Sequence, residues 1–206
     1  SKDGLLKPRV QYEPVIVGDS TLEFATAYNA DFVLQNKIGI GAVIQIVKSG
    51  DVIPKIQNVI TPSETAKMPT IPYKWNATHK DAIMINPEKN TTVREKNITK
   101  FFQDLDIERL GPGNIKRIIE AGYDSVPKIL KMKTADFMEV EGFQEKLSKT
   151  VRKNIRTGVK KTSLPMLMKA TNLLGRGMGS RRIIMILDGY PTVLTSNETP
   201  ETTYAD

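Results

Sequence analysis

The chain contains no cysteine, and only one histidine (His79) and one tryptophan (Trp75), among its 206 residues. The lack of cysteine excludes disulfides, thiolate zinc sites and a cysteine nucleophile. His79 alone cannot complete a tetrahedral zinc site, and Asp81 and Glu88 stand at no ligand spacing from it. We therefore expect no zinc. We expect His79 to be a surface residue rather than a catalyst, and Trp75 to be a local packing anchor, with base stacking as the alternative.

Long apolar runs are also missing. The longest aliphatic run is Ile183 to Leu187, far shorter than the ~20 residues of a membrane span, and no secretory pattern is found at the N-terminus. We expect no membrane association and an intracellular location, either in the cytoplasm and nucleoid or in a host cell if the protein is viral.

Acidic residues are scarce in one part of the chain. The net charge is +7, yet residues 1–65 carry six basic and seven acidic side chains, and residues 188–206 carry four acids and no base. The block from Lys146 to Arg182 holds eleven Lys or Arg and no acid. Because such a block repels itself, it favours a polyanionic partner, most simply nucleic acid. A merely basic surface is the alternative.

The first third of the chain has the pattern of β structure. Residues 9–17, 37–49 and 52–60 are rich in β-branched residues with Gly and Pro between them, while residues 20–37 show helical spacing. Short strands with one helix fit a small barrel of the OB type. We predict an α+β multi-domain fold, with an OB domain over residues 1–65.

A helical pattern dominates from Ile98 onward. Residues 66–97 contain several prolines and read as a linker or small irregular module. Residues 98–190 repeat one plan at a spacing of roughly 30 residues: an apolar stretch, a tight glycine turn and a basic amphipathic helix. Residues 191–206 read as an acidic, flexible tail.

The glycine turns are the candidate binding elements. Glycine permits a positive φ and a close approach to a ligand, and the first N–H groups of the following helix can hold a phosphate. Basic residues one turn further along can reinforce the contact. The candidate DNA-binding residues are Gly111, Gly113 and Lys116 at the first turn; Gly142, Gln144, Lys146, Lys149, Arg152 and Lys153 at the second; and Gly177, Gly179, Arg181 and Arg182 at the third. Arg117 also follows the first turn.

The helix after the second turn should divide into two faces. Leu147, Val151 and Ile155 recur every four residues and should face the core. Lys149, Arg152, Lys153 and Arg156 should share the solvent face, where a phosphate backbone would meet them.

The repeated elements resemble helix-hairpin-helix motifs, which bind the DNA backbone without reading sequence. Two departures stand out. Gln144 replaces the second glycine of the second turn, and Gly175 is an extra glycine before the third. A dinucleotide-binding interpretation of residues 175–179 is weak, because a helix precedes them where that fold needs a strand.

Residues 5–60 closely resemble the OB domain of NAD-dependent DNA ligases. The most specific stretch is "KSGDVIP", Lys48 to Pro54. The resemblance implies that Lys48 acts on the nucleotide or the nick. From the residues alone, Gly50, Asp51 and Pro54 are structural turn residues. The family has a four-cysteine zinc module where this chain has residues 66–97 without cysteine, so we expect a metal-free substitute.

A ligase also needs a lysine nucleophile, which in this family lies in a Lys-x-Asp-Gly signature. That signature does not occur in the chain. "SKDG" at Ser1 to Gly4 lacks the intervening residue, and it matches the turn leading into the barrel. By resemblance, Lys2 and Lys48 are therefore expected to assist catalysis by a separate adenylation domain, and we expect this chain alone not to be catalytic.

The resemblance implies the DNA-binding portion of an NAD-dependent DNA ligase. Such a portion would hold nicked duplex DNA while 3′-OH/5′-phosphate nicks are sealed in replication and repair. NAD and Mg²⁺ would be bound mainly by the adenylation domain, in the same polypeptide or in a separate subunit. The alternative is a non-catalytic DNA-junction module of the RuvA type, which also joins an OB barrel to tandem hairpins. A metal-dependent nuclease ranks last, because clustered carboxylates are lacking.

Overall fold

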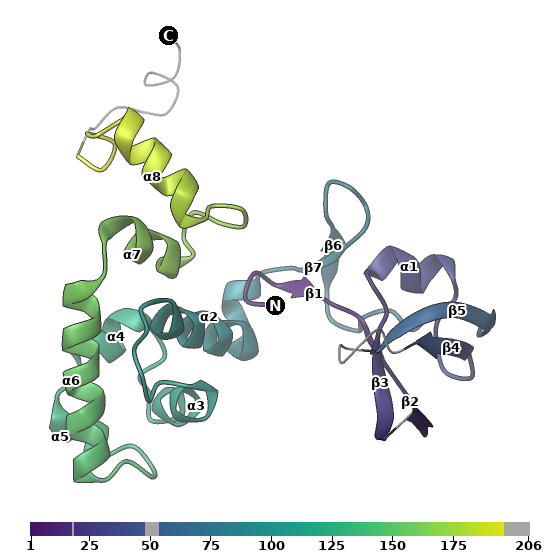
Figure 1. Ribbon diagram of the computed structural model, residues 1–206, viewed down its shortest axis with the longest axis horizontal. Helices are drawn as coiled ribbons and strands as arrows, with labels where there is room; N and C mark the ends of the chain where they lie inside the picture. The colour runs from purple at the N-terminus through teal and green to yellow at the C-terminus, as the bar shows by residue number, and fades with distance from the viewer. Residues whose placement is uncertain (18, 48–53, 196–206) are drawn as a thin grey trace. The chain divides into compact units, whose positions relative to one another are not determined.

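A computed structural model describes residues 1–195, apart from residue 18 and residues 48–53. The chain divides into two compact units, Ser1–Val93 and Arg94–Asp206. The first holds the strands and one short α-helix, and the second is helical (Figure 1). Each unit is described by itself below.

The main sheet of the first unit has four strands in the order β2-β3-β5-β4. These strands are β2 (Arg9–Val17), β3 (Ser20–Thr26), β4 (Val43–Val47) and β5 (Lys55–Thr61). β2 runs antiparallel to β3, and β4 runs antiparallel to β5, whereas β3 and β5 meet in parallel at Thr26 and Lys55. Ala25, Ala27, Val33, Ile38 and Ile56 form the buried centre. The β structure expected over residues 5–61 is therefore present in the part of this range that the structure describes.

The helix expected over residues 20–37 is shorter than predicted. Its first half is strand β3, because it pairs with β2 from Ser20 to Thr26. Helix α1 (Ala30–Gln35) begins only after Asn29, whose side chain accepts a hydrogen bond from the Phe32 amide at 2.8 Å. Such a cap satisfies an amide that has no partner within the helix. Strand pairing therefore outweighs the local helical spacing in this segment.

Residues 66–97, predicted as a linker or small irregular module, supply two strands of a second, three-stranded sheet in the order β1-β7-β6. It joins β1 (Leu5–Leu6), β6 (Tyr73–Trp75) and β7 (Ala82–Met84). The loop between β6 and β7 closes around Asn76, whose side-chain oxygen accepts from the amides of Lys80 and Asp81 at 2.9 and 3.2 Å. The hydrogen bonds to the Asn76 side chain thus fix the turn of the β6–β7 hairpin. A 3₁₀ turn follows at Pro87–Lys89.

The second unit is an assembly of helices around one core. Its elements are α2 (Thr91–Asp104), α3 (Pro112–Glu120), α4 (Val126–Lys131), α5 (Thr134–Met138), α6 (Glu145–Lys161), α7 (Leu164–Thr171) and α8 (Ser180–Gly189). Phe102, Leu110, Ile115, Phe137 and Ile155 are almost fully buried in that core. α2 begins seven residues before the expected start at Ile98, because the Asn90 side chain accepts from the Val93 amide at 3.1 Å and supports an earlier first turn.

Three helix pairs flank the glycine turns, as the repeat predicts. α2 and α3 enclose the first turn, α5 and α6 the second, and α7 and α8 the third. No helix within the described residues is long and apolar enough to cross a membrane.

Candidate nucleic-acid interface

A basic groove runs along helix α6. Two threonines lie among its cations, and its lining consists of Thr134, Lys149, Arg152, Lys153, Arg156, Thr157, Lys160 and Lys161. At 1.5 Å per residue, the stretch from Lys149 to Lys160 extends about 16 Å. Phosphates along one strand of B-DNA are spaced about 3.4 Å apart along the helix axis. The row of cations is therefore long enough to follow several consecutive phosphates.

The two faces of α6 are divided as the sequence predicts. Val151 and Ile155 are buried at 0 and 2% exposure, and Leu147 packs against the same core. Burying this face fixes the rotation of the helix, so the cations on the opposite side must face solvent. Arg152 is the exception within the basic row, because its Nη1 donates to the Leu130 carbonyl at 3.1 Å. It therefore also ties α6 to the end of α4.

The first turn differs from expectation in its backbone. Gly111 precedes α3 with φ −73°, and Gly113 lies inside the helix, so neither glycine supplies a positive φ. The left-handed residue is Arg109 at φ 69°, and the Asn114 side chain donates to its carbonyl at 2.8 Å. The prediction that a positive φ explains the glycines at positions 111 and 113 is therefore wrong. Both face open space, where a Cβ would meet nothing within 4 Å.

The second turn follows the prediction at Gly142, which has φ +76°. Gln144 precedes α6 in extended conformation and is exposed, as are Lys146 and Lys149. Lys149 donates to Glu145 at 2.6 Å, and this hydrogen bond, together with the charge of Lys149, lowers the pKa of the Glu145 carboxyl. The first turn of α6 thus carries an ionised carboxylate that offsets one of the predicted DNA-binding lysines.

The third turn contains two left-handed glycines, Gly175 at φ +77° and Gly177 at φ +94°. Gly179 directly precedes α8. Arg182 folds back so that its Nη1 donates to the Gly177 carbonyl at 3.1 Å, while Arg181 is exposed. An arginine of the following helix therefore stabilises this turn.

Of the first-unit residues predicted to assist catalysis or to shape a turn, Lys2 and Pro54 lie among the described residues. Lys2 forms a half-exposed ion pair with Asp3 at 2.8 Å, just before β1. Pro54 leads into β5, and its carbonyl accepts from the Thr26 amide at 3.0 Å, which joins β3 to β5. Lys48, Gly50 and Asp51 lie outside the described residues, so their placement relative to Lys2 stays a prediction.

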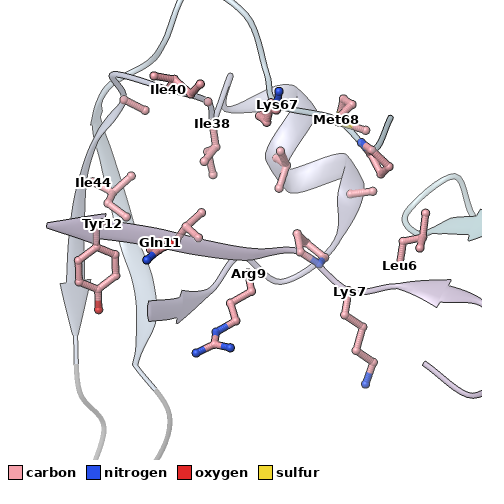
Figure 2. Close-up of a pocket in the computed structure, with 17 residues that line it drawn as sticks. Leu6, Lys7, Arg9, Gln11, Tyr12, Ile38, Ile40, Ile44, Lys67 and Met68 are labelled. Carbon is pink, nitrogen blue, oxygen red and sulfur yellow. The ribbon is translucent and has the colours of Figure 1, made fainter. Parts of the chain in front are cut away.

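A second hollow lies between β2 and the segments around Ile38 and Met68, with a volume of about 410 Å³. Figure 2 shows apolar side chains such as Ile38, Ile40 and Met68 on one side of the β2 strand, with Lys7 and Arg9 extending to the other side. Arg9 lies 3.7 Å from the centroid of the Phe24 ring, which accounts for its direction. Most residues that line the hollow are apolar, whereas the groove of α6 is lined by cations and threonines and is the better candidate for binding phosphates.

His79, the one histidine considered for metal binding, contacts an aromatic ring. His79 is exposed and stacks on Trp75 with ring centroids 4.8 Å apart. Trp75 also meets Tyr73 edge-on, as a local packing residue would. Among the described residues there is no group of three or more His, Asp or Glu side chains that could hold a metal ion.

Sequence reasoning missed four residues of the groove: Thr134, Thr157, Lys160 and Lys161. Lys160 continues the predicted row four residues beyond Arg156, and Lys161 lies eight residues beyond Lys153, so the helical period could have included both. Thr134 begins α5, and only the packing of α5 beside α6 brings it into the groove.

Comparison with known proteins identifies the relatives of the chain. A DNA ligase of Acanthamoeba polyphaga mimivirus is 38% identical over 194 residues, or 94% of this chain and 30% of that protein. DNA ligases of Desulfatibacillum aliphaticivorans and Leptospira interrogans are each 31% identical, covering 68 and 78% of the chain. The chain spans between 23 and 30% of the length of these three relatives.

These relatives place the chain among the DNA ligases. Residues 1–68 match the OB-fold domain of NAD-dependent DNA ligases. Together the matches support a relationship to DNA ligases, with the chain corresponding to a C-terminal-region fragment whose first 68 residues are similar to the OB-fold domain of the NAD-dependent enzymes.

Proposed function

We propose that the chain holds nicked duplex DNA by its phosphate backbone while a separate adenylation domain transfers AMP and seals the nick. The observation that carries the proposal is the basic groove of α6, in a chain whose relatives are DNA ligases. Backbone contacts position a protein on DNA without reading its sequence. Binding should therefore be independent of sequence and strongly dependent on salt.

The three helix pairs act in this proposal as helix-hairpin-helix motifs within residues 98–190. Residues 66–97 serve as a metal-free module after the OB domain, and residues 191–206 as a tail. Lys2 and Lys48 would approach the nucleotide when the OB domain closes on the adenylation domain. NAD and Mg²⁺ would be bound mainly outside this chain. The DNA substrate implies an intracellular site of action, in a bacterial nucleoid or in a virus-infected cell.

The test measures binding and sealing in one series. Anisotropy of a fluorescent nicked duplex, titrated at salt concentrations from 50 to 200 mM, should give a linear fall of log K with log [salt]. Addition of a ligase adenylation domain, NAD and Mg²⁺ should then join the two strands on a denaturing gel. An affinity that barely changes with salt would contradict backbone binding.

The same binding assay distinguishes a ligase portion from a DNA-junction module of the RuvA type. The relatives that cover most of the chain are ligases, so the RuvA-type alternative is not favoured. A four-way junction of equal length should bind no more tightly than the nicked duplex. Clearly tighter binding to the junction, without sealing activity, would support the junction module instead.

A further inference from the structure

Arg117 lies against a turn other than its own. It belongs to α3, which follows the first glycine turn, yet its side chain reaches the second turn at Gly142. A Cβ placed on Gly142 would lie 2.8 Å from Nη1 and 3.4 Å from the central carbon of the guanidinium. Contact this close is possible only because position 142 has no side chain.

This cation is available for a ligand. Arg117 is exposed, and within the described part of the chain no carboxylate forms an ion pair with it. Its neighbour Lys116, in contrast, lies 3.9 Å from Glu120. A guanidinium presents several N–H donors in a planar fork that suits phosphate oxygens. Arg117 therefore brings an uncompensated donor group to the surface of the second turn.

The first turn of α6 supplies no arginine of its own to the second glycine turn. Glu145 stands in the first turn of α6 and holds Lys149 at 2.6 Å, so one positive charge there is offset. At the third turn, the corresponding cation comes from the following helix, because Arg182 lies 3.4 Å from a Cβ on Gly177 and donates to the Gly177 carbonyl. Two of the turns thus have an arginine against a left-handed glycine, but only the second receives it from the preceding helix pair.

We propose that Arg117 is a DNA-backbone ligand held at the second turn by Gly142, so that the first and second helix pairs bind the duplex as one unit. The inference rests on the proposed function and adds a residue and a coupling to it. Gly142, which the sequence predicts to bind DNA itself, is in this proposal a positioning residue, because it would act through Arg117 rather than touch the DNA.

A double-mutant cycle in the full chain tests the coupling. Arg117→Gln should weaken binding to a fluorescent nicked duplex by about three- to tenfold and reduce the salt slope by about 0.9, as expected for one lost phosphate contact. Gly142→Ala should weaken binding when Arg117 is present and add little when position 117 is Gln.

Two control variants distinguish the loss of the Arg117 contact from the loss of any positive charge and from backbone strain at any glycine. Lys96→Gln removes one charge from an exposed lysine of α2 outside the turns, and it should change affinity less than Arg117→Gln does. Gly122→Ala imposes the same kind of strain, at φ +95°, with nothing within 4 Å of the added Cβ. Its effect should simply add to that of Arg117→Gln. Thermal unfolding of each variant shows whether it is folded.

Two results would overturn the inference. One is an Arg117→Gln variant that binds as tightly as Lys96→Gln, and the other is strict additivity between positions 117 and 142. If the unmodified chain itself shows no salt-dependent binding, the proposed function fails. If the unmodified chain binds and the cycle shows no coupling, only the role of Arg117 fails.

Discussion

A single residue, Asp124, links helices α2 and α4 of the second unit through two ion pairs. Its carboxylate accepts from Lys128 at 2.8 Å, on α4, and from Arg94 at 3.1 Å, on α2. The hydrogen bond from Lys128 and the neighbouring charges hold the pKa of Asp124 below its usual value of 3.8. A carboxyl whose pKa is lowered by folding stabilises the protein above its unfolded pKa, and this contribution disappears as the pH falls through the folded pKa.

Asp124→Asn should therefore lower the unfolding temperature at pH 7, with a difference from wild type that shrinks from about pH 4 toward pH 2. Thermal unfolding followed by circular dichroism from pH 2 to 7 measures this. Glu108→Gln, at an exposed position, is the matched control and should differ little from wild type at any pH. A gap between Asp124→Asn and wild type that stays constant with pH would contradict the electrostatic explanation.

Some contacts of single residues could be predicted from the sequence, and others could not. The period of four residues places Val151 and Ile155 correctly in the core, because helical geometry alone determines which residues share a face. It does not reveal that Arg152 bonds the Leu130 carbonyl, or that Arg117 lies on Gly142. Both contacts join segments more than 20 residues apart, and local spacing contains no information about them.

Helix α6 contains a glycine that the packing explains. A Cβ on Gly158 would lie 2.5 Å from Cγ1 of Ile107, a buried residue. Glycine inside a helix costs about 1 kcal/mol relative to alanine, so its presence here reflects the close approach of Ile107. The contact holds α6 against the chain segment that leads to the first turn.

Gly158→Ala should consequently destabilise the fold by about 1–2 kcal/mol, because overpacking outweighs the gain in helix propensity. Gly113→Ala, in α3 with nothing within 4 Å, should instead be neutral or stabilise by up to about 1 kcal/mol. Urea unfolding of both variants measures the difference. Equal shifts in the two variants would mean that Ile107 moves aside without cost.

Among the larger elements, the helices were easier to predict than the strands. The repeat of turn and basic helix gave the order of α3, α6 and α8, because glycine and helical period coincide there. Residues 20–26 were misread, since their pairing with β2 is a non-local interaction. The β6–β7 hairpin was read as part of a linker or small irregular module, because the outer partner of β7 comes from distant residues, Leu5 and Leu6.

The distribution of charge distinguishes the two units of the whole molecule. Residues 1–65 carry a near balance of charges, whereas the block from Lys146 to Arg182 is purely basic. Composition alone could predict this difference in charge. Only the fold shows that six of the eleven cations of the block line one groove on α6.

Replacing Lys153, Arg156 and Lys160 together by Gln should lower the salt slope of duplex binding by about 2.7, because about 0.9 is lost with each phosphate contact. The matched triple variant at Lys37, Lys55 and Lys67, which are exposed in the first unit, removes the same net charge and should change the slope far less. Anisotropy between 50 and 200 mM salt measures both. Equal losses would show that overall charge, and not the groove, governs binding.

The approach of Arg117 to Gly142 limits how this protein can be rebuilt or recombined. A segment from α5 to α6 looks self-contained in the sequence, since it has its own turn and its own basic helix. Transferred alone into another scaffold, it would leave behind the guanidinium that covers its turn. The smallest transferable piece that keeps the contact begins with α3, so exchange of parts between relatives should preserve residues 112–161 as a block.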